Sequence, residues 1–457
     1  MSMENLTQKL SKFVSTLRYD DLGEETVEYA KILLMDYIAS SAAGYRVNTS
    51  FNRAMESVYF DMGGKPESKA MFTAARYPAM TAAMINGTYV HGADLDDGNR
   101  NAMGHPGCTV ISALLALGEA MGASGKDFIT AMAAGYEVYA RVSSAVQPSH
   151  VNRGFHSTGT VGTLAAAAAC ANLLRLDAEA TEAAIALAII QAGGLIIVNE
   201  SGQACKPINP AKAAYSGILA AKLAKQGVRS SQNALESTKG FFHAFADAVD
   251  VGRFETLGRH LCIMDSYIKP YPACRHTHAG ADAAKELRQQ IGDPKQIERI
   301  TVRIYPVAIS LAGKIAMPRS VDEAKFSIAY AICCAMVNGS FGLDDILDPG
   351  ACDPRIREMA QKVEIVCDQS YEDPKKGTRG AGVQVLLRDG RIFTKIVPLP
   401  KGDPEYALDR AGICDKLDSS AGDLLNEKQK KQITEQVFNL EKAGDMSDLI
   451  LCLAPEK

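Results

Sequence analysis

From Leu6 to about Gly258 the sequence repeats one pattern, in which alanine-rich runs carry further apolar residues every three or four positions and are separated by glycine. The clearest examples are "GTLAAAAACANLLRL" and "AKAAYSGILAAKLAKQG". Apolar residues at this spacing line one face of a helix, and small alanine side chains let neighbouring helices approach closely. The pattern therefore predicts a large all-helical domain whose helices are packed on several sides.

The pattern changes after Lys269. The segment "IERITVRIYP" alternates apolar with polar residues, and "GVQVLLRDGRIFTKIV" predicts two strands joined by a turn at Asp389-Gly390. Between them, "EAKFSIAYAICCAMVNG" predicts a helix that ends at Asn338-Gly339, and an amphipathic helical pattern returns between Leu424 and Leu453. We therefore expect a second domain of the α+β class, and a last helix that packs back onto the helical domain.

Length and charge exclude several classes of partner. A chain of 457 residues is long enough for two domains, and its net charge of −4 gives no general attraction for nucleic acid or anionic membranes. The first thirty residues lack the apolar core of a secretory signal. The most apolar run, from Ala183 to Asn199, is shorter than the ~20 residues that span a bilayer, and predicts a buried helix ending near Gly193-Gly194. We therefore expect a cytoplasmic protein without nucleic-acid or membrane partners.

The cysteines do not form a recognisable metal or redox motif. None of the eleven sits in a C-x-x-C pair, so we expect them to be reduced residues of the core. An iron–sulfur cluster would need distant cysteines to converge, because the chain has no local cluster motif.

The segment "HGADLDDGNRNAMGHPG", residues 91–107, concentrates polar side chains in an otherwise apolar region. An Asp-rich turn is one interpretation. A calcium loop is excluded, because counting from Asp94 the sixth and twelfth positions are Asn99 and His105 rather than Gly and Glu. A carboxylate and an imidazole in one loop suit general acid–base catalysis, and His105 directly precedes a helix N-terminus that would attract anions. We expect Asp96, Asp97 and the glycines to shape the loop.

A second histidine stands at the start of an alanine-rich helix in "RGFHSTGTVG". The hydroxyls that follow His156, on Ser157, Thr158 and Thr160, are good N-cap residues, and we expect them to cap this helix. Capping does not explain the histidine itself. A carboxylate ligand beside His156 would be favoured by the positive end of the helix dipole.

Cationic residues gather in two further segments. Lys206 lies in "ACKPINPAKAA", and "YIKPYPACRHTHAG" contains Lys269, Arg275, His276 and His278 near the change of pattern. A His-x-His pair can bind a metal, but no third ligand is nearby in the sequence. Charges at a domain boundary favour a ligand site. Removal of a proton from a carbon beside a carboxylate places extra negative charge on that carboxylate. Cationic residues would stabilise this charge, and the acid–base residues would remove the proton, so the two groups together suit this reaction.

Five segments in this order resemble the MmgE/PrpD family: "NGTYVHGADLDDGNRNAMGHPG", "GFHSTGTVGTLAAAAA", "KPINPAKAAYSGILAAKLAKQG", "KPYPACRHTHAGADAA" and "EAKFSIAYAICCAMVNG". The resemblance implies a large all-helical domain, residues 1–267 and 405–457, with a smaller α+β domain, residues 268–404, inserted between them. It also implies a homodimer without metal or organic cofactor. Family members include 2-methylcitrate dehydratase, cis-aconitate decarboxylase and iminodisuccinate epimerase.

The resemblance also implies roles for particular residues. The matching positions that belong to the family's motifs are Asp94, His105, His156, Lys206, Lys269, His278 and Tyr330. From sequence alone Tyr330 is a helix core residue, so its role in the site rests on the resemblance. Two positions depart from the family: Gly98 replaces a threonine or serine of many relatives, and Cys274 replaces a histidine of the decarboxylase branch. The second change argues against decarboxylation of cis-aconitate.

The sequence thus predicts a cofactor-independent hydro-lyase for a small hydroxy-polycarboxylate such as 2-methylcitrate. Lys206, Lys269 and Arg275, with His276, His278 and Tyr330, would bind the substrate. Asp94 or His156 would remove the proton and His105 would protonate the departing hydroxyl, although these acid and base roles are interchangeable. An epimerase or decarboxylase would use the same carbanion chemistry, and a non-catalytic polycarboxylate-binding protein is the alternative of another class.

Overall fold

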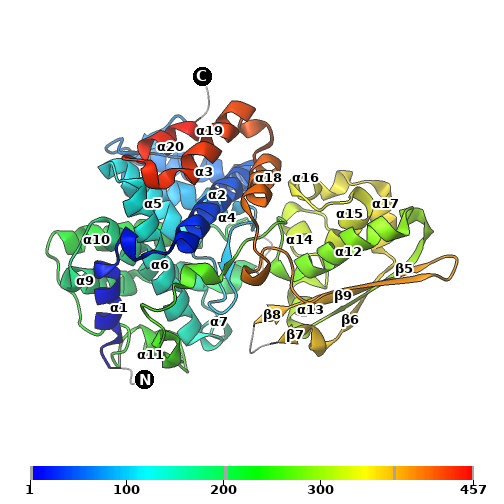
Figure 1. Ribbon diagram of the computed structural model, residues 1–457, viewed down its shortest axis with the longest axis horizontal. Coiled ribbons are helices and arrows are strands. Elements are labelled where there is room, and N and C mark those ends of the chain that lie inside the picture. The colour runs from blue at the N-terminus through cyan, green and yellow to red at the C-terminus, as the bar shows by residue number, and fades with distance from the viewer. Residues whose placement is uncertain (1–3, 200–203, 374–376, 455–457) are drawn as a thin grey trace. The chain divides into compact units, whose positions relative to one another are not determined.

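The computed structural model describes residues 4–199, 204–373 and 377–454. Its chain divides into two compact units. The larger comprises Met1–Gly92, Asp96–Tyr267 and Asp409–Lys457, and the smaller comprises Ala93–Leu95 and Ile268–Leu408. The domain boundaries predicted from the sequence, 267/268 and 404/405, lie beside two of these divisions. The expected fold class is confirmed, because the larger unit is helical and the smaller one combines helices with a sheet (Figure 1).

The larger unit contains fourteen α-helices among its described residues. They are α1 (Leu6–Thr16), α2 (Glu24–Val47), α3 (Thr49–Met62), α4 (Ala79–Gly92), α5 (Gly107–Met121), α6 (Gly125–Val146), α7 (Ser149–Asn152), α8 (Ser157–Leu173), α9 (Ala178–Gln191), α10 (Ile208–Lys225), α11 (Phe241–Phe245), α18 (Arg410–Ala421), α19 (Glu427–Phe438) and α20 (Ser447–Cys452). Two antiparallel pairs of short strands join β1 (Ser68–Lys69) to β2 (Arg76–Tyr77) and β3 (Gly98–Asn99) to β4 (Ser266–Tyr267).

Helix α8 lies at the centre of this unit, and every one of its residues is buried. It packs against α5, α6, α9 and α10, which accounts for its run of alanines. Helix α9 ends at Gln191, just before the two glycines, as predicted, but the apolar run is not buried throughout, because Ile190 and Ile197 are exposed. The C-terminal helices return to the larger unit, where α18 and α19 pack on α2 and α20 packs on α5 (Figure 1).

The approach of α10 to α8 requires a glycine. A Cβ at Gly217 would lie 2.4 Å from the Cβ of Ala166 and 2.8 Å from its carbonyl carbon. Contacts this short lie in the upper part of the ~1–3 kcal/mol that overpacking costs, and alanine regains ~1 kcal/mol of helix propensity, so we expect Gly217→Ala to lower the free energy of unfolding by about 1–2 kcal/mol. Urea unfolding measures the change.

Gly444→Ala is the matched control for this packing prediction. A Cβ at Gly444 would meet no atom within 4 Å, so its substitution should change stability by less than about 0.5 kcal/mol. A Gly217→Ala variant as stable as this control would contradict the packing argument.

The smaller unit is built on a four-stranded sheet in the order β10-β9-β5-β6. Its strands are β5 (Ile297–Ile304), β6 (Val363–Cys367), β9 (Ala381–Leu387) and β10 (Ile392–Val397), and β7 (Glu372–Asp373) pairs separately with β8 (Thr378–Arg379). Its helices are α12 (His278–Ile291), α13 (Pro306–Ala312), α14 (Val321–Lys325), α15 (Ile328–Asn338), α16 (Leu343–Leu347) and α17 (Pro354–Ala360). Strands β5 and β6 run parallel, and the other two pairings are antiparallel.

Local sequence signals explain several parts of this unit. The hairpin from β9 to β10 turns at the predicted Asp389-Gly390, where Gly390 has a φ of 87° that favours glycine. Helix α15 ends at Asn338 with Gly339 in the left-handed conformation, also as predicted. Helix α12 packs on β9 and β10, and α15 packs on α12 and α17 (Figure 1).

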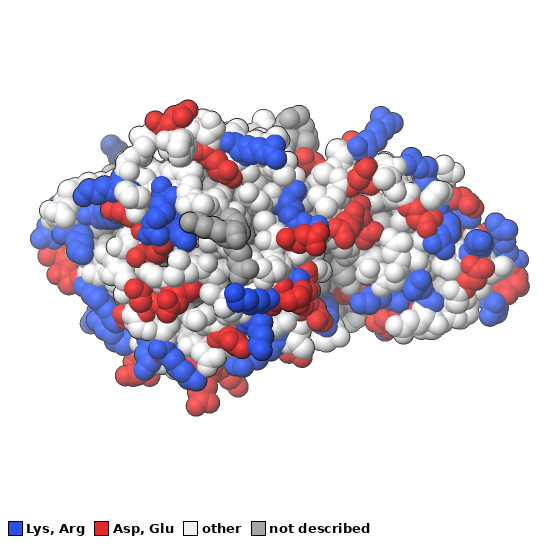
Figure 2. Space-filling model, turned by 90° about the horizontal axis from the view of Figure 1, so that it is seen from above, with Lys and Arg blue, Asp and Glu red and all other residues white. Residues whose placement is uncertain are grey.

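The surface carries charges of both signs. On the face seen in Figure 2, lysine and arginine side chains are interspersed with aspartate and glutamate rather than gathered over one region. Among the described residues, no helix combines the length and apolar character needed to cross a membrane.

Candidate active site

The loop between α4 and α5 is held by Asp97, as the sequence predicted. Its carboxylate accepts hydrogen bonds from the backbone N–H of Gly107 (3.0 Å) and the hydroxyl of Tyr136 (2.9 Å). Burial raises the pKa of Asp97 well above its usual range, and the nearby charges of Asp36 and Asp96 raise it further. Asp97 therefore fixes the start of α5 from inside the protein.

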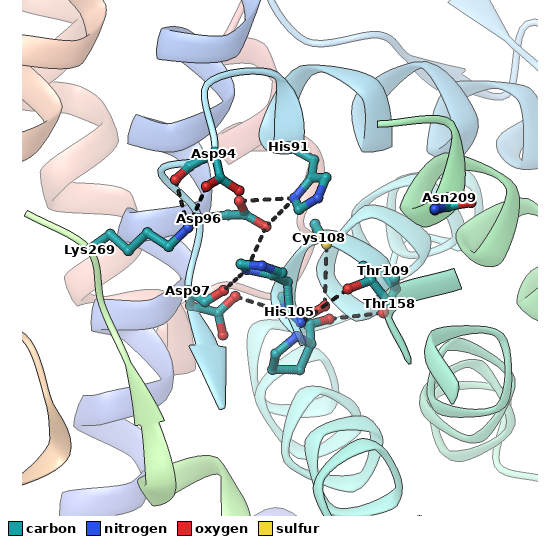
Figure 3. A network of polar contacts seen from close by, with 12 residues as sticks. His91, Asp94, Asp96, Asp97, His105, Cys108, Thr109, Thr158, Asn209 and Lys269 are labelled. Atoms are coloured by element: carbon teal, nitrogen blue, oxygen red, sulfur yellow. Dashed lines mark hydrogen bonds and ion pairs between the residues drawn. The ribbon is translucent and has the colours of Figure 1, made fainter. Parts of the chain in front are cut away.

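His105 ends this loop and is oriented by two aspartates. Its Nδ1 lies 2.7 Å from the carbonyl oxygen of Asp97 and 3.6 Å from Oδ2 of Asp96 (Figure 3). Because a carbonyl oxygen can only accept, Nδ1 carries a proton and donates it. In the neutral ring, Nε2 then keeps its lone pair and can accept a proton. The Asp96 carboxylate would stabilise the imidazolium that forms.

Asp96 also binds His91, which the sequence analysis did not select. Nδ1 of His91 lies 2.8 Å from Oδ2 and 3.0 Å from Oδ1 of Asp96, and the rings of His91 and His105 are 4.9 Å apart in an edge-on arrangement. All three side chains are buried. Asp96 therefore does more than shape the loop, because it joins two histidines (Figure 3).

His156 is the N-cap residue of α8, but the hydroxyls after it do not cap the helix as predicted. Among the described residues, the N-cap His156 makes no side-chain capping bond to α8, and the helix already begins at Ser157, so the threonines lie within its first turn. Thr158 instead accepts the backbone N–H of His105 (3.3 Å), and Thr160 contacts His150 Nε2 (2.8 Å). Thr158 thus links the start of α8 to the loop that carries His105.

The ring of His156 is held by Asn209, the second residue of α10. Asn209 Nδ2 lies 2.9 Å from Nδ1 of His156 and 3.3 Å from the carbonyl oxygen of Leu195. The rings of His156 and His91 have centroids 6.2 Å apart. The larger unit thus brings His91, His105 and His156 close together.

Lys206 lies in the turn before α10 and is partly exposed. Burial raises the pKa of the Cys108 thiol well above its usual range, Asp96 and Asp97 add to this shift, and the charge of Lys206 opposes it. The thiol therefore stays protonated and is not a candidate nucleophile. The same influence shows that Lys206 supplies positive potential near the start of α5.

The structure explains why position 98 is a glycine rather than a threonine or serine. A Cβ at this position would lie 2.4 Å from the hydroxyl oxygen of Tyr267, on the strand paired with β3. The Tyr267 side chain therefore occupies the space into which a threonine or serine at position 98 would extend.

Asp94 and Lys269 form a buried pair in the smaller unit. Lys269 Nζ lies 3.2 Å from Asp94 Oδ2 and donates a 2.7 Å hydrogen bond to the Asp94 carbonyl (Figure 3). Asp94 has a φ of 53°, a left-handed conformation that aspartate tolerates better than most residues. Lys269 therefore fixes both the backbone and the carboxylate of Asp94.

Arg275 and the two neighbouring histidines are buried among protein partners. Arg275 pairs with Asp403 (2.7 Å) and donates to Nδ1 of His278 (3.0 Å), whose Nε2 in turn contacts the carbonyl of Ala273 (3.1 Å). Nδ1 of His276 bonds the Tyr305 hydroxyl. Burial lowers the pKa of His276 to about 3 and that of His278 well below its usual range. Both rings are therefore neutral.

Tyr330 is a buried residue of α15, and its hydroxyl donates to the carbonyl of Asp345 (2.7 Å). This matches the core position expected from its helix pattern alone. Its role in substrate binding rests on the resemblance and stays a prediction, and the substrate-binding roles of Lys269, Arg275, His276 and His278 stay predictions as well.

Two family models match this sequence, the MmgE/PrpD N-terminal domain over residues 8–253 and the MmgE/PrpD C-terminal domain over residues 271–441. The chain belongs to the MmgE/PrpD family. The cis-aconitate decarboxylase-like protein oryM of Aspergillus oryzae is 27% identical over 481 residues, covering 99% of this chain and 98% of that protein. The cis-aconitate decarboxylase of Mus musculus is 26% identical over 472 residues, covering 98% and 93%. A mitochondrial 2-methylcitrate dehydratase of Yarrowia lipolytica is 25% identical over 134 residues, or 28% of this chain and 26% of that protein.

Among the described residues of this MmgE/PrpD protein, one group of side chains could hold a metal ion. Ligand atoms of His91, Asp96 and His105 all lie within 4.8 Å of one another. A cation bound through Nδ1 of either histidine would replace the contact that this nitrogen makes with the Asp96 carboxylate or the Asp97 carbonyl. The sequence candidates His276 and His278 do not converge, because their rings bond different partners.

Sequence reasoning missed His91 and Asn209. His91 precedes Asp96 by five residues in the segment already singled out, so its proximity was a usable signal. Asn209 is 53 residues from His156 along the chain, and nothing local in "KPINPAKAA" indicates that its amide meets a histidine.

Proposed function

We propose that this MmgE/PrpD protein is a lyase that moves a proton at a carbon beside a carboxylate of a small polycarboxylate, without a metal or organic cofactor. The observation that carries the proposal is the orientation of His105. Its Nδ1–H is fixed by the carbonyl of Asp97, and Asp96 lies beside it to stabilise the protonated ring. Nε2 is thereby prepared to exchange a proton with a substrate carbon.

Two lyase reactions use such a residue in opposite directions. In dehydration, His105 takes a proton from carbon while a second group gives a proton to the departing hydroxyl. In decarboxylation, carbon dioxide leaves, its bonding electrons stay on the carbon framework, and protonated His105 returns a proton to carbon. His156 would donate a proton or hydrogen bond from Nε2 in both cases, and Lys206 would hold a carboxylate of the substrate.

Decarboxylation of a cis-aconitate-like substrate is the first reaction to test. Relatives named as cis-aconitate decarboxylases align with 97–99% of this chain, whereas the 2-methylcitrate dehydratase aligns with 28% of it. Dehydration of 2-methylcitrate or a close analogue is the second candidate, and it is supported by Cys274, which replaces the histidine of the decarboxylase branch. Both candidates keep the proposed acid–base chemistry.

A panel of hydroxy- and unsaturated di- and tricarboxylates, followed by proton NMR and carbon dioxide measurement, tests the proposal. Carbon dioxide with an unsaturated dicarboxylate product identifies decarboxylation, and a new alkene without carbon dioxide identifies dehydration. Deuterium exchange beside a carboxylate without a new alkene identifies an epimerase. Acids that raise the melting temperature but stay unchanged identify a binding protein and contradict the lyase proposal.

The same assay tests the absence of a metal. Dialysis against EDTA is expected to leave the rate unchanged, because His105 and His156 handle the protons themselves. Loss of activity that Zn²⁺ or Mn²⁺ restores would overturn this part of the proposal and would implicate His91, Asp96 and His105 as ligands. We also propose that two copies associate, as the resemblance implies, which sedimentation measures directly. The cytoplasmic location stays a prediction.

A further inference from the structure

Two of the buried histidines in the larger unit are held by opposite kinds of partner. The ring of His105 meets a carbonyl oxygen, which can only accept a hydrogen bond. The ring of His156 meets the amide of Asn209, which can present either a donor or an acceptor depending on its orientation. The orientation of one amide therefore decides where His156 carries its proton.

A second contact fixes that orientation. The Asn209 atom that faces His156 also lies 3.3 Å from the carbonyl oxygen of Leu195. Only the NH₂ group can bond a carbonyl, so Nδ2 must point this way, with one hydrogen for each partner. Asn209 is buried and sits at the start of α10, where its own backbone N–H bonds the carbonyl of Lys206 (3.2 Å). Two contacts at Nδ2 and one backbone hydrogen bond thus hold Asn209 in place.

The consequence for His156 follows from counting protons. Nδ1 accepts a hydrogen from Asn209, so it carries none, and the neutral ring has its proton on Nε2. An imidazolium would place a second N–H against the amide N–H, which disfavours protonation of Nδ1. The backbone of His156 is also fixed, because its N–H donates to Gly194 (3.0 Å) and its carbonyl accepts from Thr160 (3.1 Å).

We propose that Asn209 is a positioning residue that holds His156 as the neutral Nε2–H tautomer, so that His156 serves as the hydrogen donor while His105 exchanges the proton with carbon. The role of His156 as hydrogen donor rests on the proposed function, whereas its tautomer does not. It assigns the acid and base roles that the sequence left interchangeable. Asn209 acts through His156 and needs no contact with substrate.

Nitrogen NMR of the full chain labelled with ¹⁵N-histidine tests the tautomer directly. The chain has eight histidines, and the signals of His156 are identified by their absence in His156→Gln. We expect wild-type His156 to show a protonated Nε2 and an unprotonated Nδ1. A proton on Nδ1, alone or together with Nε2, at neutral pH would overturn the proposal. Apart from the His156→Gln protein used for assignment, this measurement needs neither a substrate nor an activity assay, so it remains informative if the proposed function fails.

Asn209→Asp replaces the amide NH₂ that donates to Nδ1 of His156 with a carboxylate oxygen that can only accept, and it changes the shape of the side chain little. The His156 spectrum is expected to shift to a protonated Nδ1, and kcat is expected to fall about tenfold to a hundredfold with KM nearly unchanged. Asn209→Leu removes the donor without adding charge and should give a mixture of tautomers. A His156 spectrum that both variants leave unchanged would contradict the proposal.

Asn172→Asp is the matched control. Asn172 is also a buried asparagine whose Nδ2 donates to two carbonyls, those of Val14 (2.7 Å) and Leu17 (3.2 Å), but in the described part of the chain it has no histidine partner. The same change there introduces a buried charge without touching His156. It should lower stability and leave the His156 tautomer as in the wild type. A tautomer shift in this control equal to that of Asn209→Asp would attribute the effect to general destabilisation and overturn the proposal.

Discussion

Replacing His105 with alanine is expected to lower kcat/KM for the physiological polycarboxylate by about 10²–10⁴-fold while the protein remains folded. The imidazole is buried, its ring donates to the backbone carbonyl of Asp97, and its backbone N–H bond to Thr158 survives the substitution. The loss therefore falls on proton transfer rather than on the fold. Steady-state kinetics with the substrate identified by the panel measure it.

Proton exchange distinguishes a catalytic loss from a binding defect. If the reaction is dehydration, wild-type enzyme in deuterated water should exchange the hydrogen beside the carboxylate, and His105→Ala should lose this exchange together with turnover. If it is decarboxylation, deuterium should enter the product carbon, and this step should slow in the variant. In both cases KM should change less than kcat.

His243→Ala is the matched control, because His243 is exposed and its ring contacts only the carbonyl of Ser237 among the described residues. It should keep wild-type activity. Near-normal turnover in His105→Ala would remove His105 from the mechanism and, with it, the observation on which the proposed function rests.

The sequence predicted the architecture because local patterns encode it. The alanine runs require close helix packing, and α8 shows that packing on all sides. The Asp389-Gly390 turn and the Gly339 stop depend on backbone conformations that glycine permits at those positions. Each of these features depends on neighbours in the chain, so one sequence is sufficient to detect them.

The site was predicted less completely, because its important contacts join residues far apart in the chain. His105 and His156 were found as chemically capable residues beside helix starts. Their protonation could not be derived, because it depends on the Asp97 carbonyl and on the amide of Asn209. The hydroxyls after His156 were assigned to capping because the sequence does not show that the helix begins at Ser157.

A buried ion pair close to the His105 loop could not be predicted from the sequence. Lys416 of α18 pairs with Asp36 of α2, 380 residues away, and their side chains are 4% and 1% exposed. The backbone of Asp97, whose carbonyl holds His105, lies close enough to lower the pKa of the Asp36 carboxyl. The C-terminal helices therefore stabilise the loop that carries the proposed proton-exchange residue.

Lys416→Met is expected to lower the free energy of unfolding by about 3–5 kcal/mol near pH 8, because it leaves a buried carboxylate without its cation. Oδ2 of Asp36 has no hydrogen-bond partner among the described residues, so little replaces the lost contact. Burial raises the pKa of Asp36 to about 6, and Lys416 opposes that rise. A carboxyl group whose pKa is higher in the folded than in the unfolded protein stabilises the fold while it is protonated. This contribution is complete below the unfolded pKa of 3.8 and is lost as the pH rises through the folded pKa of about 6. Methionine moves the folded pKa higher, so the deficit should be smaller at pH 5 than at pH 8.

The double variant Lys416→Met/Asp36→Asn separates this charge effect from lost packing. Since the asparagine carries no charge, the double variant should be more stable than Lys416→Met alone at pH 8 and should lose most of the pH dependence of the deficit. Arg229→Met is the control for an exposed pair. Arg229 Nη1 lies 2.6 Å from Glu179 Oε1, and the two side chains are 64% and 71% exposed, so this substitution should lower the free energy of unfolding by less than about 1 kcal/mol. Urea unfolding at the two pH values measures all four proteins. A double variant no more stable than the single one would show that Lys416 supports the fold through its packing, and Asp36 would then contribute no uncompensated charge beneath the His105 loop.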